Sequence, residues 1–192
     1  MAVSTMVVPM QRYRFTVGQY ERMGMAGILT EDSRVELING EIIAMSPIGP
    51  RHADCVAMLN RLLARQAPDT VLVAVQNPIR LPDDTEPQPD LSLLRFARYT
   101  RTLPIASDTL VVVEVSDTTL DYDRQAKLPL YAAAGIPEAW LVDLGANRIE
   151  RHTEPGPDGY HLIARFGVGS DMESVILPEI VVSVDTILGL GA

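Results

Sequence analysis

Apolar residues recur at helical spacing between His52 and Gln66. Positions three and four apart lie on the same side of an α-helix, so this stretch is predicted to be an amphipathic helix that packs one face on a core. A shorter helix is predicted to begin after Thr16, because Gln19 follows three residues later with the spacing of a capping box. The apolar side of the longer helix consists of Cys55, Val56, Leu59, Leu62 and Leu63.

Other apolar runs have the spacing of strands. The segment from Arg34 to Met45 is predicted to be a hairpin, because Asn39-Gly40 favours the type I′ turn that joins two paired strands. The run from Thr109 to Val115 is apolar almost throughout, which predicts a central strand buried on both faces. Further strands are expected at residues 71–81, 90–95 and 138–143.

A third helix is predicted from Asp121 to Ala134 and ends before Gly135 and Pro137. Pro129 is unfavourable inside a helix, so the regular helix either starts near Lys127 or is kinked at the proline. Short strand-like runs and turns follow up to Leu188. The element order predicts a mixed α/β domain of the α+β kind, with a central sheet flanked by helices and β-hairpins at both ends. The chain has no glycine-rich phosphate loop, which argues against a dinucleotide-binding fold. Residues 1–13 are expected to be a flexible tail and residues 14–192 a single domain.

Composition narrows the class of protein. The chain has 192 residues, of which 47% are hydrophobic, enough for a sizeable core. It contains no apolar run of about 18 residues, so no membrane span is expected. Cys55 is the single cysteine, which precludes an intramolecular disulfide and fits a cytoplasmic protein. The net charge of −9 counts against a broad basic surface for nucleic acid, although a bound metal could offset it locally.

Two carboxylates stand at positions that suggest chemistry. Asp90 follows a proline at the start of a strand, where it is either a turn residue or part of a site. Glu114 lies within an apolar strand, where a carboxylate needs an ion pair, a raised pKa or a metal. Mg²⁺ prefers oxygen ligands and commonly takes one or two carboxylates, so Asp90, Glu114 and the backbone carbonyl of Val115 could hold it.

The remaining candidates each have a plain structural alternative. Lys127 could reach the carboxylates, but on spacing alone it is expected to be solvated and paired with Asp123 four residues earlier. His52 could contact a phosphate or metal or be an exposed residue at a helix start, and Glu36 is by default a surface carboxylate. Three more side chains are not expected to be catalytic: Tyr131 is assigned to the core, and His152 and His161 to the solvent-facing C-terminal hairpins. An arginine-bearing loop, with Arg95, Arg98 and Arg101, is expected to be solvated, with phosphate contact as the alternative.

An ordered set of motifs runs along the chain: residues 36–41, Met45-Ser46-Pro47, His52, Pro89-Asp90, Glu114-Val115-Ser116, residues 123–131 and residues 135–143. This set resembles the Uma-two family of restriction-endonuclease-like proteins, within the PD-(D/E)XK nuclease superfamily. The resemblance extends from Phe15 to Leu188 and implies the restriction-endonuclease-like fold, with Asp90 and Glu114 as metal ligands. The superfamily usually has a lysine two residues after the glutamate, where this chain has Ser116. The resemblance implies that Lys127, from the following helix, takes that role.

The sequence therefore predicts an endonuclease that hydrolyses DNA with Mg²⁺ or Mn²⁺, using Asp90, Glu114 and Lys127. Two alternatives stand beside this prediction. The first is a weakly active or inactive module that keeps the nuclease fold for binding or assembly. The second is a metal-independent hydrolase in which Asp90 and Glu114 form an acid/base pair. The apolar edges of the terminal hairpins leave a homodimer open.

Overall fold

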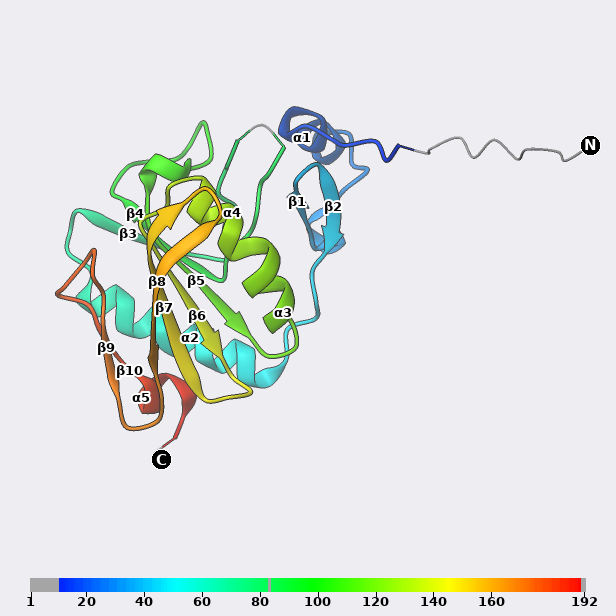
Figure 1. The fold of residues 1–192 in the computed structure, drawn as a ribbon. Coiled ribbons are helices and arrows are strands. Elements are labelled where there is room, and N and C mark those ends of the chain that lie inside the picture. The colour runs from blue at the N-terminus through cyan, green and yellow to red at the C-terminus, as the bar shows by residue number, and fades with distance from the viewer. Residues whose placement is uncertain (1–10, 83, 191–192) are drawn as a thin grey trace, which may run out of the picture.

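The computed structural model describes residues 11–82 and 84–190. Their regular elements follow one another as a helix, a hairpin, a long helix, three strands, a broken helix and then a strand-rich C-terminal part (Figure 1). The elements are α1 (Val17–Met25), β1 (Val35–Ile38), β2 (Glu41–Ala44), α2 (Pro50–Gln66), β3 (Val71–Val75), β4 (Leu91–Arg95), β5 (Thr109–Ser116), α3 (Leu120–Tyr122), the π-helical turn η3 (Asp123–Lys127), α4 (Leu128–Ala133), β6 (Glu138–Asp143), β7 (Arg148–Gly156), β8 (Gly159–Phe166), β9 (Asp171–Glu173), β10 (Val181–Ser183) and α5 (Val184–Leu188), with 3₁₀ turns at Glu31–Ser33 and Ala106–Asp108.

Six strands form the central sheet in the order β3-β4-β5-β6-β7-β8. Only β5 and β6 are parallel to each other, and every other neighbouring pair is antiparallel. All residues of β5 and β6 are buried, as expected for strands covered on both faces. The predicted central strand is therefore confirmed, and so is the mixed sheet flanked by helices.

The two faces of the sheet carry separate cores. On one face α2 and α5 pack with β9 and β10 against side chains such as Val113, Trp140 and Val142. On the other face the broken helix covers Val112 and Leu141 (Figure 1). Glu114 follows Val112 by two positions and therefore points to the side of the broken helix.

The hairpin β1–β2 stands beside the sheet and closes with the predicted turn (Figure 1). Asn39 has φ 48° and Gly40 has φ 75°, the left-handed conformations that a type I′ turn requires. A Cβ atom at Gly40 would lie 2.6 Å from Cβ of Arg14, so the chain also needs glycine for close approach. An isolated bridge between Leu37 and Glu86 ties the hairpin to the connection between β3 and β4.

Three predicted elements differ from the structure. The strand expected over residues 71–81 ends at Val75, because Gln76 adopts φ 50° and turns the chain. The long helix begins at Pro50, with the proline in its first turn, where no backbone donor is needed. The helix expected from Asp121 is interrupted by the π-helical turn, and the regular helix starts at Leu128 with Pro129 in its first turn, which confirms the first of the two predicted alternatives. Most of the expected tail, residues 1–10, lies outside the described residues. No helix among the described residues is long and apolar enough to cross a membrane.

Candidate active site

A cleft of about 700 Å³ opens at the carboxyl end of β5. The β1–β2 hairpin, the start of α2 and the segment from Asp117 to Lys127 form its walls. Its charged lining is mostly acidic, with Arg34 and Lys127 as the only Lys or Arg side chains among the described lining residues. The acidic lining residues are Glu36, Asp90, Glu114, Asp117, Asp121 and Asp123.

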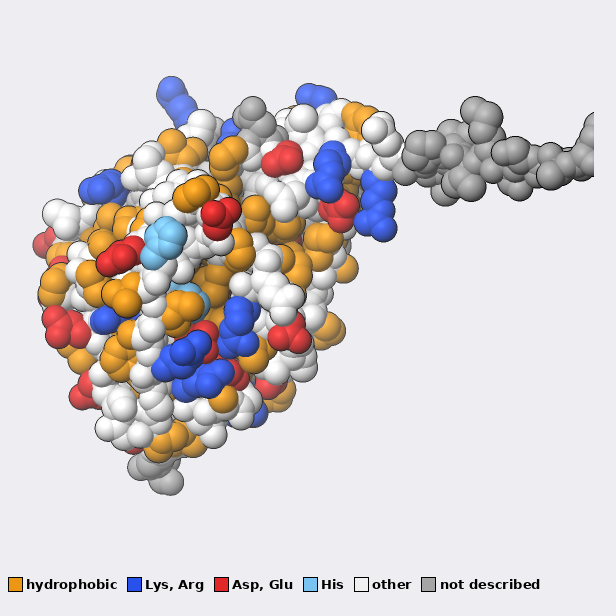
Figure 2. Space-filling model, viewed as in Figure 1, with side chains coloured by type: hydrophobic (Ala, Val, Ile, Leu, Met, Phe, Trp, Pro, Cys, Tyr) orange, Lys and Arg blue, Asp and Glu red, His pale blue; other side chains and the backbone are white. Residues whose placement is uncertain are grey.

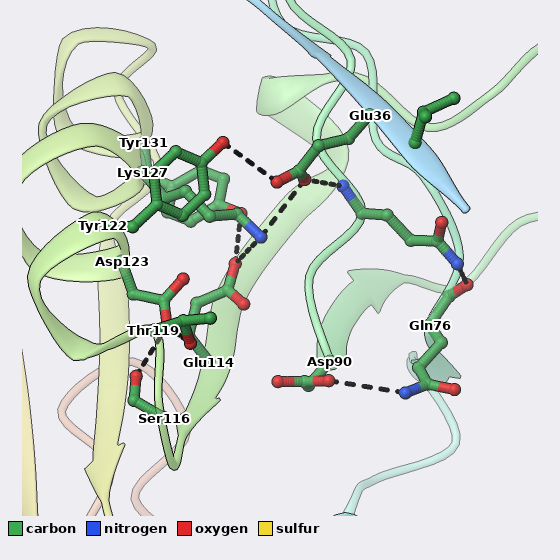
Figure 3. Close-up of polar contacts among 12 residues, drawn as sticks. Glu36, Gln76, Asp90, Glu114, Ser116, Thr119, Tyr122, Asp123, Lys127 and Tyr131 are labelled. Atoms are coloured by element: carbon green, nitrogen blue, oxygen red, sulfur yellow. Dashed lines mark hydrogen bonds and ion pairs between the residues drawn. The ribbon is translucent and has the colours of Figure 1, made fainter. Parts of the chain in front are cut away.

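Asp90 is held by neighbours on both sides. Its Oδ2 accepts a hydrogen bond from the backbone N–H of Val115 at 2.9 Å and lies 3.0 Å from Nε2 of His52. Its Oδ1 accepts only a long hydrogen bond, 3.5 Å, from the side chain of Gln76 among the described residues (Figure 3). The N–H and C=O of one strand residue point toward the same neighbouring strand, so the carbonyl of Val115 points to the same side as Asp90.

Glu114 and Lys127 form a buried ion pair. Nζ of Lys127 lies 2.8 Å from Oε1 of Glu114 and 3.3 Å from Oε2 of Glu36 (Figure 3). The lysine is 4% exposed and Glu114 is 3% exposed. The hydroxyl of Tyr131 also donates to Oε1 of Glu114, at 2.5 Å. The second oxygen of Glu114, Oε2, has no hydrogen-bond donor among the described residues, although both donors to Oε1 hold the carboxylate in place.

Glu36 is fixed by three donors. Besides Lys127, the hydroxyl of Tyr122 donates to its Oε1 at 3.1 Å and the backbone N–H of Gln88 donates to its Oε2 at 3.0 Å. These contacts join the β1–β2 hairpin to the broken helix and to the segment before Asp90. Glu36 is thus a buried member of the site and not a surface carboxylate, because chain segments far away in sequence cover it.

The electrostatics of the pair follow from burial and charge count. Burial raises the pKa of the Glu114 carboxyl well above its usual range, and the nearby Lys127 lowers it only in part. Burial alone would lower the pKa of Lys127, but the facing carboxylates of Glu114 and Glu36 outweigh it and raise that pKa. Burial likewise raises the pKa of Asp123. One lysine thus faces several buried carboxylates, an excess of negative charge that a bound cation would relieve.

The π-helical turn explains how Lys127 reaches Glu114. The N–H of Leu128 donates to the carbonyl of Asp123, five residues earlier, which widens the helix by one residue. Asp123 and Lys127 are both buried as a result, and the ammonium group pairs with Glu114 and Glu36 and not with Asp123. Asp123 instead accepts hydrogen bonds from the hydroxyls of Ser116 at 2.7 Å and Thr119 at 2.6 Å.

The family can be assigned once this geometry is in place. Residues 17–185 match the model of the Uma2 family, described as putative restriction endonuclease. The chain belongs to the Uma2 family. The resemblance stated from the motifs is thereby confirmed, and Uma2 membership makes the chain a member of a restriction-endonuclease-like nuclease family.

A solved structure has the same fold as this Uma2 chain. It is described as a putative nuclease belonging to DUF820 from Anabaena variabilis. It superposes with a TM-score of 0.72 at 15% sequence identity and covers 92% of this chain and 98% of its own. No curated protein matches the chain. At this identity the likeness establishes the nuclease fold alone.

The structure brings all six sequence candidates of this Uma2 chain to one cleft: His52, Glu36, Asp90, Glu114, Val115 and Lys127. The expectation that Lys127 is solvated and paired with Asp123 is wrong. His152 is also buried, on β7 outside the cleft lining, so its assignment to solvent is wrong, whereas His161 is exposed as expected. Arg95 lies at the far end of β4 from Asp90, and neither it nor the loop that follows lines the cleft.

Sequence reasoning missed two tyrosines of the Uma2 site. Tyr131 was assigned to the core, which is right for its ring, but its hydroxyl bonds Glu114. Tyr122 was not considered, although its hydroxyl bonds Glu36. A signal was present, because Asp123, Lys127 and Tyr131 are spaced by four and share one side of a helix.

The residues of the site fit a divalent ion that is bound in part by water. The described residues contain no cluster of three His, Cys, Asp or Glu side chains that could hold a metal alone. Mg²⁺ commonly takes only one or two carboxylates and keeps several waters, which suits a pair such as Asp90 and Glu114. The unused Oε2 of Glu114, the weakly bonded Oδ1 of Asp90 and the excess negative charge all agree with this kind of site.

Proposed function

We propose that this chain is an endonuclease that hydrolyses phosphodiester bonds of DNA with Mg²⁺ or Mn²⁺. The observation that carries the proposal is the ammonium group of Lys127, 2.8 Å from Glu114, in the cleft that also holds Asp90. Two carboxylates and a lysine in one cleft are the functional groups that the restriction-endonuclease-like family implies, here with the lysine supplied by a helix.

Asp90, Glu114 and the carbonyl of Val115 would hold the metal. The ion would supply Lewis acidity, which lowers the pKa of a bound water and neutralises charge that develops on the phosphate. Glu114 is suited to this role because Tyr131 and Lys127 fix its orientation through Oε1 and leave Oε2 open. His52 and Val115 fix Asp90 in the same way.

Lys127 acts as a cation and hydrogen-bond donor. The facing carboxylates of Glu114 and Glu36 raise the pKa of Lys127, which favours its protonated form and this role. An ammonium group beside the reacting phosphate stabilises the charge of the transition state and orients a water through its N–H groups. Glu36 is a positioning residue, because it holds the lysine from the side opposite Glu114.

A cleavage assay tests the proposal. Supercoiled plasmid and single-stranded DNA are incubated with the full chain and Mg²⁺ or Mn²⁺, and Asp90→Asn and Glu114→Gln are expected to lower the rate roughly a hundredfold or more. Asp158→Asn and Glu179→Gln make the same chemical changes at exposed positions outside the cleft lining and should cleave like wild type. Equal activity in wild type and Asp90→Asn would refute the proposal.

Metal titration separates the alternatives. Calorimetry with Mn²⁺ should give binding that is lost in Glu114→Gln and kept in Glu179→Gln. Mn²⁺ binding without cleavage of any DNA would favour the inactive binding or assembly module. Turnover of a glycoside in the presence of EDTA would favour the acid/base hydrolase, in which the Lys127 contact would have no assigned purpose.

A further inference from the structure

A second charged cluster lies outside the cleft, around Glu150 on β7. Glu150 is 1% exposed, and three arginines converge on its Oε1: Arg165 at 3.1 Å, Arg124 at 3.2 Å and Arg148 at 3.4 Å. Arg148 also pairs with Asp143 at 3.0 Å. Blue side chains gather over red ones on this face of the molecule (Figure 2).

The cluster carries more positive charge than negative charge. Three guanidinium groups face Glu150 and Asp143, which leaves one positive charge in excess. Burial lowers the pKa of the neighbouring His152, so that side chain adds no charge at neutral pH. Arg165 is 58% exposed, and Arg124 and Arg148 are about one-third exposed. A guanidinium has five N–H donors, so the exposed parts of these side chains have donors beyond those that contact Glu150 and Asp143, although Nε of Arg148 is buried.

The cluster and the cleft lie on one row of the sheet. The register pairs Glu114 with Leu141, Leu141 with Glu150, and Glu150 with Arg165. These residues share the face covered by the broken helix. Glu150 is two strands from Glu114, which is about 10 Å at the usual strand spacing. The same turn of the broken helix supplies Lys127 to Glu114 and Arg124 to Glu150.

The cleft itself is poorly suited to hold a long phosphate chain. Its lining is dominated by carboxylates, so only the reacting phosphate, next to a metal and Lys127, would be stabilised there. Phosphates a few positions along the strand need cations elsewhere. About 10 Å corresponds to roughly three nucleotides at the helical rise of one strand.

We propose that Arg124, Arg148 and Arg165 bind phosphates of the nucleic-acid strand whose reacting bond lies in the cleft. This inference rests on the proposed nuclease function. The guanidinium groups recognise phosphate by charge and by paired N–H donors, so the contact carries no sequence preference. Glu150 holds the three side chains in place from below, and their outward donors face the strand.

Fluorescence anisotropy with labelled single-stranded and duplex oligonucleotides tests the proposal. The full chain is titrated in EDTA, so that binding is measured without cleavage. Loss of one phosphate contact at 0.1 M salt weakens duplex binding about eightfold and lowers the salt slope by about 0.9. Arg165→Gln and Arg148→Gln should each show such a loss. Arg61→Gln and Arg65→Gln remove the same charge from exposed positions of α2, on the opposite face of the sheet, and should bind like wild type.

Glu150→Gln provides the sharper test. If the arginines bind phosphate, removal of the competing carboxylate should tighten oligonucleotide binding severalfold. If they serve only to neutralise Glu150, the affinity should not change, and the proposal fails. Thermal melting checks that each variant is folded, and Arg165→Gln, at the most exposed of the three arginines, is the variant least prone to misfold.

The outcomes distinguish this proposal from the nuclease function. Arginine-dependent binding without any cleavage would keep the phosphate contact and refute the nuclease. Cleavage with unchanged affinity and KM in the arginine variants would keep the nuclease and overturn the phosphate contact. Binding of inorganic phosphate, or of anionic vesicles, in place of oligonucleotides would also overturn it.

Discussion

Glu114 and Glu150 occupy the same row of one sheet, two strands apart, yet their charges are balanced in opposite ways. Glu114 shares a single lysine with Glu36 inside an acidic cleft, and burial raises its pKa. Glu150 has three arginines, and although burial raises its pKa, Arg165 and Arg124 outweigh burial and lower it. The ratio of cations to carboxylates, and not burial alone, therefore separates a place suited to a metal from a place suited to an anion.

The largest expected effect comes from removing Lys127, the single lysine that Glu114 and Glu36 share. Lys127→Met should destabilise the protein by about 3–5 kcal/mol, because it leaves buried carboxylates without their partner. Arg165→Met, at a half-exposed position with two other arginines nearby, should cost no more than about 1 kcal/mol. Urea unfolding at pH 7 measures both. Similar losses in the two variants would break the contrast between the clusters.

The parts of the fold differ in how far the sequence predicts them. The Asn39-Gly40 turn and the long helix α2 follow from local signals, because turn conformation and helical spacing need only neighbouring residues. The burial of β5 also follows from its own apolar run. All of these predictions are confirmed.

The burial of Glu36 and His152 did not follow from the sequence. Glu36 lies in a short hairpin, and one of the side chains that contact it, Lys127, is 91 positions later in the chain. His152 has the local pattern of an exposed hairpin strand, but Tyr160 packs beside it. The π-helical turn was not predicted either: Lys127 at its end pairs with Glu36, which lies far away in the sequence.

The next largest effect is expected at a tyrosine hydroxyl. Tyr131→Phe should cost about 1.5–3 kcal/mol, because it removes a hydrogen bond to a carboxylate from a fully buried site. Tyr160→Phe removes a hydroxyl that donates to the backbone carbonyl of Ile136, so about 0.5–1.5 kcal/mol is expected. Chemical denaturation compares the two. A larger loss of stability in Tyr160→Phe would show that the hydrogen bond from the Tyr131 hydroxyl to Glu114 is not the stronger of the two.

Salt should weaken the ion pairs around Glu150 more than the ion pair between Lys127 and Glu114. A double-mutant cycle of Arg165→Gln and Glu150→Gln should give a coupling energy of about 0.2–1 kcal/mol in low salt, because the Arg165 side chain is 58% exposed and solvent screens the pair from that side. This coupling should fall in 1 M NaCl, where the screening length drops to about 3 Å. The matching cycle of Lys127→Met and Glu114→Gln should be larger and should change little with salt, because both side chains are almost fully buried. Equal salt dependence in both cycles would contradict the difference in exposure.

The smallest effect concerns His152 and the pH. Burial lowers the pKa of His152, and Arg124 and Arg165 add to this, although Glu150 opposes it. The unfolded chain then binds a proton more readily than the folded protein as the pH falls below about 6.5, so stability decreases there and stops decreasing below the folded pKa. The loss amounts to about 1.4 kcal/mol for each unit by which the pKa is lowered.

His152→Gln should lose less stability than wild type between pH 7 and 5, whereas His161→Gln, at an exposed position, should follow wild type. In Arg165→Gln the dependence should shrink, because one of the charges that keep His152 neutral is gone, and an unchanged pH profile in that variant would mean that the arginine excess does not act on His152.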